Sequence, residues 1–172
     1  MPRRLIALVV MLLVGVVGLA GCGSSPDVTA AADKAASDTS PYAFTARTLD
    51  GKDFDGQSLK GKPTVLWFWA PWCPTCLRQA EGVRKALAAD GTRVNLLGVA
   101  GLDSEAAMAE FVAKAKIDGL TSLSDEPGVL WKKFEVTEQS TFVLLDASGA
   151  VVGREQFNAK EIPGRVKTLA AG

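Results

Sequence analysis

Six consecutive apolar, aromatic or β-branched residues, from Thr64 to Trp69, form an uninterrupted hydrophobic run. A run of this length predicts a strand buried on both faces, as in a parallel sheet covered by helices. Ala70 and Pro71 end the run, and from Cys76 onward apolar residues recur at steps of three and four, which indicates a helix. The segment WCPTC, residues 72–76, therefore lies where a buried strand ends and a helix begins.

The hydrophobic pattern also predicts elements on both sides of this segment. Alternation over residues 42–47, the turn signal Asp50-Gly51 and residues 52–54 predict a hairpin before the buried strand. Further strands alternate with helices downstream: strands 94–99, 120–123, 141–145 and 150–157, and helices 105–115, 128–134 and 160–170. Elements in this order join parallel strands through right-handed crossovers, which predicts an α/β fold with one central sheet.

The short helix predicted over residues 128–134 carries four large apolar side chains. Val129, Leu130 and Phe134 are expected to face the core. Trp131 is expected to be a packing residue, because a large aromatic side chain at such a place more often belongs to the core than to a substrate site.

The first residues have the pattern of an export signal. Arg3 and Arg4 precede an apolar stretch over residues 5–17, and small residues follow it up to Cys22. A single membrane span is the alternative, but spanning a bilayer takes ~20 apolar residues and this stretch is shorter. Residues 1–21 are therefore predicted to be a signal peptide, which places the mature chain in an oxidising compartment where disulfides persist.

Residues 22–41 are rich in Ala, Ser, Asp and Thr and nearly lack large apolar side chains. Such a segment cannot bury enough surface to offset its conformational entropy, so a flexible tether is predicted before a folded domain over residues 42–172. The LAGC sequence that ends at Cys22 resembles the lipobox of bacterial lipoproteins, in which signal peptidase II cuts before a cysteine that becomes lipidated. This resemblance implies that Cys22 is a lipid anchor and not a redox partner.

The charge of the chain is balanced, with 19 Lys and Arg against 19 Asp and Glu. Removal of residues 1–21 takes away Arg3 and Arg4 and no acidic residue, which leaves 17 basic against 19 acidic residues, a net charge of −2. Without a basic excess to neutralise phosphates, nucleic acid is not expected as a partner. A zinc site is not expected either, because it needs four ligands and the chain has no His and only Cys22 beyond the pair in WCPTC.

The two cysteines of WCPTC have the spacing of a redox pair. The first N–H groups of a helix have no partner within the helix and carry partial positive charge, which stabilises a thiolate at Cys73. Cys73 is therefore predicted to be the attacking sulfur. Cys76 lies one turn further along, less exposed, where it can close a disulfide and release a partner bound to Cys73. A metal-binding or purely structural pair is the alternative.

WCPTC after an apolar strand, the helix that follows and the FVLLDASG hairpin resemble the thioredoxin superfamily. Within it, the N-terminal hairpin and the segments KPTVLWFWAPWCPTC and LLGVAGLDSEAAMAEFV are similar to the secreted Dsb-type proteins of actinobacteria, DsbE and DsbF, over about residues 42–170. The lipobox matches the lipoprotein member, DsbF. The resemblance implies a thioredoxin-like α/β fold in which helices flank a central mixed sheet, with an N-terminal β-hairpin as an extension.

The same resemblance implies an exported thiol–disulfide oxidoreductase that needs no cofactor besides the disulfide between Cys73 and Cys76. Its expected substrates are thiols of exported proteins, and oxidation is the expected direction. A membrane partner related to vitamin K epoxide reductase is expected to reoxidise it. Lipidation at Cys22 implies a place on the cell membrane, facing the extracytoplasmic side.

Three positions depart from the family pattern. The superfamily places a cis-proline beside the cysteines, and counting back from the hairpin turn puts Ser140 there. A cis bond before a residue other than proline costs ~2.5 to 4 kcal/mol, so a trans peptide or a shifted loop is expected, which puts backbone pairing of a client at Ser140 in question. Gln79 replaces the Glu of related reductases, Trp67 replaces the buried Asp of thioredoxins, and Glu81 is expected on another side of the helix. Without either acid Cys76 lacks an internal base, which argues against a fast general reductant.

Trp72, Pro74 and Thr75 complete the predicted surroundings of the thiols, and Pro-Thr in place of the Gly-Pro of thioredoxin favours oxidation by resemblance. The direction depends on a reduction potential that spans ~150 mV between thioredoxin and strong oxidants, about 7 kcal/mol. One alternative is a TlpA- or ResA-like reductase of exported thiols, such as the haem-binding cysteines of apocytochrome c. The other is a metal-binding lipoprotein, because the missing proline at Ser140 would open the thiols to a metal ion. The lack of His argues against a copper chaperone of the Sco type.

Overall fold

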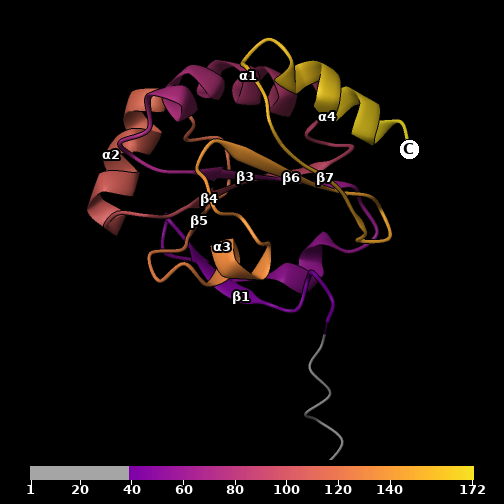
Figure 1. The fold of residues 1–172 in the computed structure, drawn as a ribbon, viewed down its shortest axis with the longest axis horizontal. Helices are drawn as coiled ribbons and strands as arrows, with labels where there is room; N and C mark the ends of the chain where they lie inside the picture. Colours follow the sequence, from indigo (N-terminus) through magenta and orange to yellow (C-terminus); the bar gives the residue numbers. More distant parts are fainter. Residues whose placement is uncertain (1–38) are drawn as a thin grey trace, which may run out of the picture. The chain divides into compact units, whose positions relative to one another are not determined.

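The computed structural model describes residues 39–172, so the predicted signal peptide and nearly all of the predicted tether, with Cys22, lie outside the described residues. The described chain forms a seven-stranded sheet in the order β2-β1-β5-β4-β3-β6-β7, with helices on both faces (Figure 1). The strands are β1 (Thr45–Thr48), β2 (Asp53–Asp55), β3 (Thr64–Trp69), β4 (Asn95–Ala100), β5 (Ser122–Ser124), β6 (Thr141–Leu145) and β7 (Val151–Gln156). The helices are α1 (Pro74–Asp90), α2 (Glu105–Ala115), α3 (Val129–Lys133) and α4 (Ile162–Ala170), and a 3₁₀ turn, η1 (Gly56–Leu59), follows β2.

Strand β3 lies at the centre of the core. It pairs in parallel with β4 and antiparallel with β6, and all six of its residues are buried. Its side chains alternate between two clusters. Val65, Trp67 and Trp69 pack with residues of α1, α2 and α4, and Leu66 and Phe68 pack with residues of α3. Figure 1 shows α1, α2 and α4 on one face of the sheet and α3 on the other. Burial of a side chain such as Val, Leu or Phe contributes about 1.5–3 kcal/mol, so this strand anchors both halves of the core. The predicted α/β fold with a central mixed sheet is confirmed.

The predicted N-terminal hairpin is present and extends the main sheet. β1 pairs antiparallel with β2, with Ala46 opposite Phe54, and also antiparallel with β5. It begins later than the alternation predicted, because Tyr42 lies in a preceding turn in which the Phe44 N–H donates to the Tyr42 carbonyl at 2.9 Å. Tyr42 is nevertheless buried, which explains why it fits the apolar half of the alternating pattern.

The described chain enters the fold at the end of the sheet that is remote from the cysteines. Because β6 runs antiparallel to β3, β6 begins beside the carboxyl end of β3 and finishes at the other end of the sheet. The turn after β6 contains Gly149, where an added Cβ would lie 2.8 Å from the ring of Tyr42. The Lys133 ammonium also donates to the carbonyl of Ser40 at 3.1 Å. Residues 40–42 are therefore fixed at the end of the sheet opposite Cys73.

Helix α3 differs from the prediction at one position. Leu130, Trp131 and Phe134 are buried as expected, but the prediction for Val129 is wrong, because its side chain is 61% exposed. The reason is the start of the helix, one residue later than predicted. The Asp125 carboxylate accepts hydrogen bonds from the N–H groups of Val129 at 2.8 Å and Trp131 at 2.9 Å, which fixes the first turn with Val129 pointing outward. Trp131 packs edge-on against Phe68 with ring centroids 5.5 Å apart.

Candidate active site

Cys73 occupies the position just before α1, where strand β3 has ended and the helix begins. Its Sγ accepts a hydrogen bond from the N–H of Cys76 at 3.0 Å. Its own N–H donates to the carbonyl of Ala70 at 3.1 Å, which ties the turn between strand and helix. The helix begins at Pro74, two residues before the position indicated by the apolar pattern, because proline fits the first helical turn, where an N–H would lack a partner. A thiolate at Cys73 therefore has a helix N-terminus and a direct donor to stabilise it.

Cys76 lies one turn into α1 and is fully buried, and in this structure both cysteines are free thiols. Burial raises the pKa of the Cys76 thiol, and the neighbouring Cys73 raises it further. Backbone hydrogen bonds from Ala70 and Ser140 act in the opposite direction and only partly offset the rise in pKa. Cys76 is therefore a neutral thiol at pH 7.

Trp72 projects beside the thiols. Its side chain is 55% exposed, and its Nε1–H donates to the carbonyl of Leu102 at 3.2 Å. Leu102 itself is 49% exposed and has a φ of 63°, an uncommon backbone conformation for a residue other than glycine. No sequence pattern points to Leu102, because only the fold brings the loop after β4 beside the turn after β3. Together these two side chains present an apolar surface next to Cys73.

The other predicted neighbours lie on the first turn of α1. Pro74 is exposed, and Thr75 accepts a hydrogen bond at its Oγ1 from the Arg78 guanidinium at 2.8 Å. Glu81 is exposed and bonded to Lys85 at 2.6 Å, so it points away from the thiols as expected.

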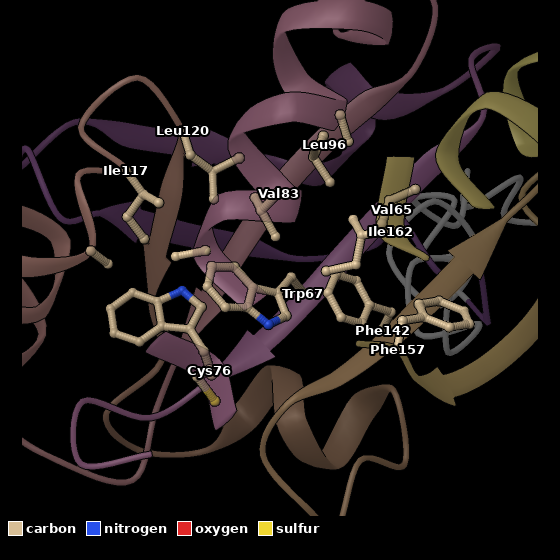
Figure 2. Close-up of a cluster of buried hydrophobic side chains, with 14 of the residues drawn as sticks. Val65, Trp67, Cys76, Val83, Leu96, Ile117, Leu120, Phe142, Phe157 and Ile162 are labelled. Carbon is tan, nitrogen blue, oxygen red and sulfur yellow. The ribbon is translucent and has the colours of Figure 1, made fainter. Parts of the chain in front are cut away.

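Gln79 and Trp67, the two departures from the family pattern inside the core, contact each other. The Gln79 Oε1 accepts a hydrogen bond from the Trp67 Nε1–H at 2.9 Å. Its Nε2 donates to the carbonyls of Ser140 at 3.1 Å and Phe157 at 2.7 Å. The Gln79 side chain is 1% exposed and lies among the buried residues around Trp67 and Cys76. Figure 2 shows Trp67 and Cys76 in one cluster with Phe142 and Phe157. The sequence indicates only that Gln79 stands where related proteins have an acid, and no sequence pattern predicts its three hydrogen bonds.

Ser140 sits just before β6 with a φ of 66°. Its N–H donates to the carbonyl of Phe68 at 2.8 Å, and its carbonyl accepts from Gln79. Both backbone polar groups of Ser140 are therefore engaged within the protein, so a client backbone could pair there only by displacing one of them.

Within residues 39–172 there is no group of three or more His, Cys, Asp or Glu side chains placed to hold a metal ion. In the same part of the chain no helix is both long and apolar enough to cross a bilayer.

Comparison with known proteins links this geometry to a family. The AhpC/TSA family profile matches residues 36–154. The soluble secreted antigen MPT53 of Mycobacterium tuberculosis is 35% identical over 167 residues, which cover 95% of this chain and 91% of MPT53. MTB DsbF, in a structure of its mixed oxidised and reduced forms, has 45% sequence identity to this chain. The two structures superpose with a TM-score of 0.70 over 75% of this chain and 96% of DsbF. A secreted Mycobacterium tuberculosis disulfide oxidoreductase homologous to E. coli DsbE is 39% identical with a TM-score of 0.67, over 74% of this chain and 97% of that one.

Proposed function

Because the chain belongs to the thioredoxin-like AhpC/TSA family and is a thiol–disulfide oxidoreductase of the DsbE and DsbF type, we propose that it oxidises cysteine pairs of exported proteins through Cys73 and Cys76. In the proposed reaction a client thiolate attacks Cys73 in the Cys73–Cys76 disulfide, and Cys76 leaves and takes up a proton. The second client thiolate then attacks the client sulfur of the mixed disulfide and releases Cys73 as a thiolate. Two electrons pass from the client dithiol to the cysteine pair.

The observation that carries the proposed direction is the hydrogen bond from the Cys76 N–H to the Cys73 Sγ at the start of α1. This donor and the helix N-terminus stabilise the thiolate that leaves in the last step, and a disulfide whose reduced form is stabilised is a strong oxidant. The state of Cys76 acts in the same direction. A buried neutral thiol, with Gln79 in place of an acid beside it, is slow to attack the mixed disulfide and return the client unchanged.

Export and anchoring complete the proposal. MPT53 is named as a soluble secreted antigen, which supports export of this chain. Lipidation at Cys22 after removal of residues 1–21, and reoxidation by a membrane protein related to vitamin K epoxide reductase, are proposed from the sequence. Palmitate labelling in the native host tests the anchor. Loss of label and of membrane association in Cys22→Ala is expected, and unchanged membrane association in that variant would show that Cys22 is not the anchor.

The reduction potential of the Cys73–Cys76 couple tests the direction. The purified protein is equilibrated in glutathione buffers of known ratio, and its redox state is followed by the fluorescence of Trp69 and Trp72. We expect a potential above about −200 mV, with the oxidants, whereas a value near about −270 mV would assign the protein to the thioredoxin-like reductants.

A trapping experiment tests the chemistry itself. Cys76→Ser removes the second sulfur, so a mixed disulfide between Cys73 and a client cysteine should accumulate, and Cys73→Ser should form none at the client. A metal ion bound in one-to-one ratio through both sulfurs of the purified protein would instead support the metal-binding alternative.

A further inference from the structure

A hollow of about 460 Å³ lies between α1, the helix that contains Cys76, and the end of α2. Its charged lining consists of four cations and one acid: Arg78, Arg84, Lys114, Lys116 and Glu81. We call it the basic hollow. Glu81 is already paired with Lys85 at 2.6 Å. In the part of the chain that the structure describes, none of the four cations forms an ion pair, so the basic hollow contains four positive charges without an acidic partner.

The helix dipoles explain only part of this charge. Lys114 lies in the last turn of α2 and Lys116 follows the end of that helix, where a cation is stabilised by about 0.3–1 kcal/mol. Arg78 instead lies near the N-terminus of α1, where the dipole does not favour a cation, and the first turn of α1 contains no acid. The charge at Arg78 is therefore not explained by the stability of the helices.

The basic hollow begins one turn of α1 from the reactive cysteine. Leu77 lines it, and the Leu77 N–H donates to the carbonyl of Cys73 at 3.2 Å. The Arg78 guanidinium donates at 2.8 Å to Oγ1 of Thr75, which lies between the two cysteines. With a rise of 1.5 Å per residue, Arg84 is about 16 Å further along the helix axis than Cys73. An extended client segment advances about 3.3 Å per residue, so a residue about three to five positions from its reacting cysteine can reach the basic hollow.

Two of the four cations are already oriented in the free protein. Arg84 is half-buried, and its guanidinium donates to the carbonyl of Ala115 at 2.9 Å. A guanidinium has five N–H donors in a planar fork, so this bond leaves others that can bind a carboxylate. Arg78 is oriented by its bond to Thr75 in the same way. Because these side chains are ordered before a ligand arrives, binding costs less conformational entropy than it would with free side chains.

We propose that the basic hollow binds an acidic side chain of the client, Asp or Glu, about three to five residues from the client cysteine that reacts with Cys73. This inference rests on the proposed function and names its class of client, which is a dithiol segment with an acidic flank. The carboxylate takes no part in the chemistry, in which two electrons still pass from the client dithiol to the Cys73–Cys76 disulfide. An anionic membrane is the poorer match, because these cations line a concavity beside the thiols, whereas a membrane presents a flat surface.

Oxidation of matched dithiol peptides by the disulfide form of the purified protein tests the proposal. The two peptides of a pair differ in three flanking residues, which are Glu in one and Ser in the other. The flank lies three to five positions before the first cysteine in one pair and as far after the second cysteine in another. At about 10 mM ionic strength, where the Debye length is ~30 Å, we expect the second-order rate constant of the Glu peptide to be about tenfold larger in at least one pair. At about 1 M, where the Debye length is ~3 Å, the ratio should fall to nearly one.

Two double variants separate the basic hollow from the overall charge of the protein. Lys114→Gln with Lys116→Gln removes two charges of the hollow and leaves the hydrogen bonds of Arg78 and Arg84 in place. It should reduce the tenfold ratio to about threefold or less. Lys60→Gln with Lys167→Gln removes the same charge from two exposed positions outside the hollow and should leave the ratio unchanged. Because each ratio compares two peptides on one protein, a general loss of activity cancels.

Each other outcome counts against a distinct claim. If the Ser peptides are oxidised and the Glu peptides react no faster, or if both double variants reduce the ratio equally, the basic hollow is not a client subsite. The inference is also overturned if Lys114→Gln with Lys116→Gln weakens binding to vesicles of anionic phospholipid while the peptide ratio stays the same. If the disulfide form oxidises neither peptide of any pair, the proposed function itself fails, and the inference fails with it.

Discussion

The buried thiol of Cys76 makes the stability of the reduced protein depend on pH in the alkaline range. Burial raises the pKa of Cys76 in the folded protein, whereas in the unfolded chain a cysteine has a pKa of about 8.5. Above that pH the unfolded state therefore binds fewer protons than the folded state. Stability is full below about pH 8.5 and falls as the pH rises, because the unfolded thiol ionises and the folded thiol does not.

The size of the effect follows from the difference in ionisation alone. From pH 7 to pH 10, a thiol that stays protonated in the fold but ionises in the unfolded chain with a pKa of about 8.5 costs about 2 kcal/mol. A domain of this kind has a total stability of about 5–15 kcal/mol, so the loss is a large part of it. With a urea slope of about 1–3 kcal/mol per molar, the midpoint should move by about 1 M.

Two variants isolate the contribution of Cys76. Cys73→Ala retains Cys76 as the only cysteine of the described domain, and Cys73→Ala with Cys76→Ala has none. Urea unfolding of both is followed by tryptophan fluorescence at pH 7 and pH 10, and the ionisation of Tyr42 and the lysines cancels in the comparison. We expect the single variant to lose about 2 kcal/mol more than the double variant over this range. Equal losses would mean that Cys76 ionises as readily in the fold as in the unfolded chain, which would refute the reasoning.

Three substitutions test other features of the structure. Gly82→Ala in α1 would place a Cβ 2.2 Å from the carbonyl oxygen of Ala159, so it should reduce the free energy of unfolding in urea by about 2 kcal/mol. The matched change Gly164→Ala in α4, where an added Cβ meets no atom within 4 Å, should leave that free energy unchanged or raise it by up to about 1 kcal/mol. Equal effects of the two substitutions would contradict the close approach at Gly82. Asp125→Ala removes the carboxylate that accepts from the part-buried N–H of Val129 and the buried N–H of Trp131, so it should lower the free energy of unfolding by about 1–3 kcal/mol without changing the reduction potential. An unchanged urea midpoint would show that these two hydrogen bonds are dispensable. Trp72→Ala removes half-exposed apolar surface beside Cys73, so it should raise KM for dithiol peptides with apolar flanking residues. The melting temperature should stay within about 2–4 °C of that of the parent protein. An unchanged KM would exclude Trp72 as a contact for clients.

The fold was largely predictable because its strongest signals are local. The buried run of β3 and the strand-to-helix change at WCPTC each depend on neighbours in sequence, and helix α2 was predicted at its observed bounds, where Ser104 caps its first turn. Element ends were less well predicted. The start of α1 was placed at Cys76 because apolar periodicity begins there, although Pro74 already opens the helix. Val129 was misplaced because the carboxylate that orients α3 comes from Asp125, which the apolar pattern does not include.

The surroundings of the thiols were predicted in composition but not in arrangement. Resemblance to a family indicated that Gln79, Trp67 and Ser140 stand at unusual positions, and it treated them as separate losses. The structure joins them in one hydrogen-bonded set, which no periodicity could reveal because its members are far apart in the sequence. The contact between Trp72 and Leu102 was missed for the same reason.

The position of residues 40–42, at the end of the sheet away from Cys73, gives the domain a direction with respect to any attachment at its N-terminus. If Cys22 carries the proposed lipid, the attachment reaches the domain at the end of the sheet remote from Cys73. The 16 residues between Cys22 and the described chain, 23–38, could span at most ~60 Å when fully extended, while a domain of this size has a radius of gyration of about 14 Å. That reach would let the same molecule turn over, so one anchored protein could oxidise exported clients and then present its thiols to a membrane-bound oxidant.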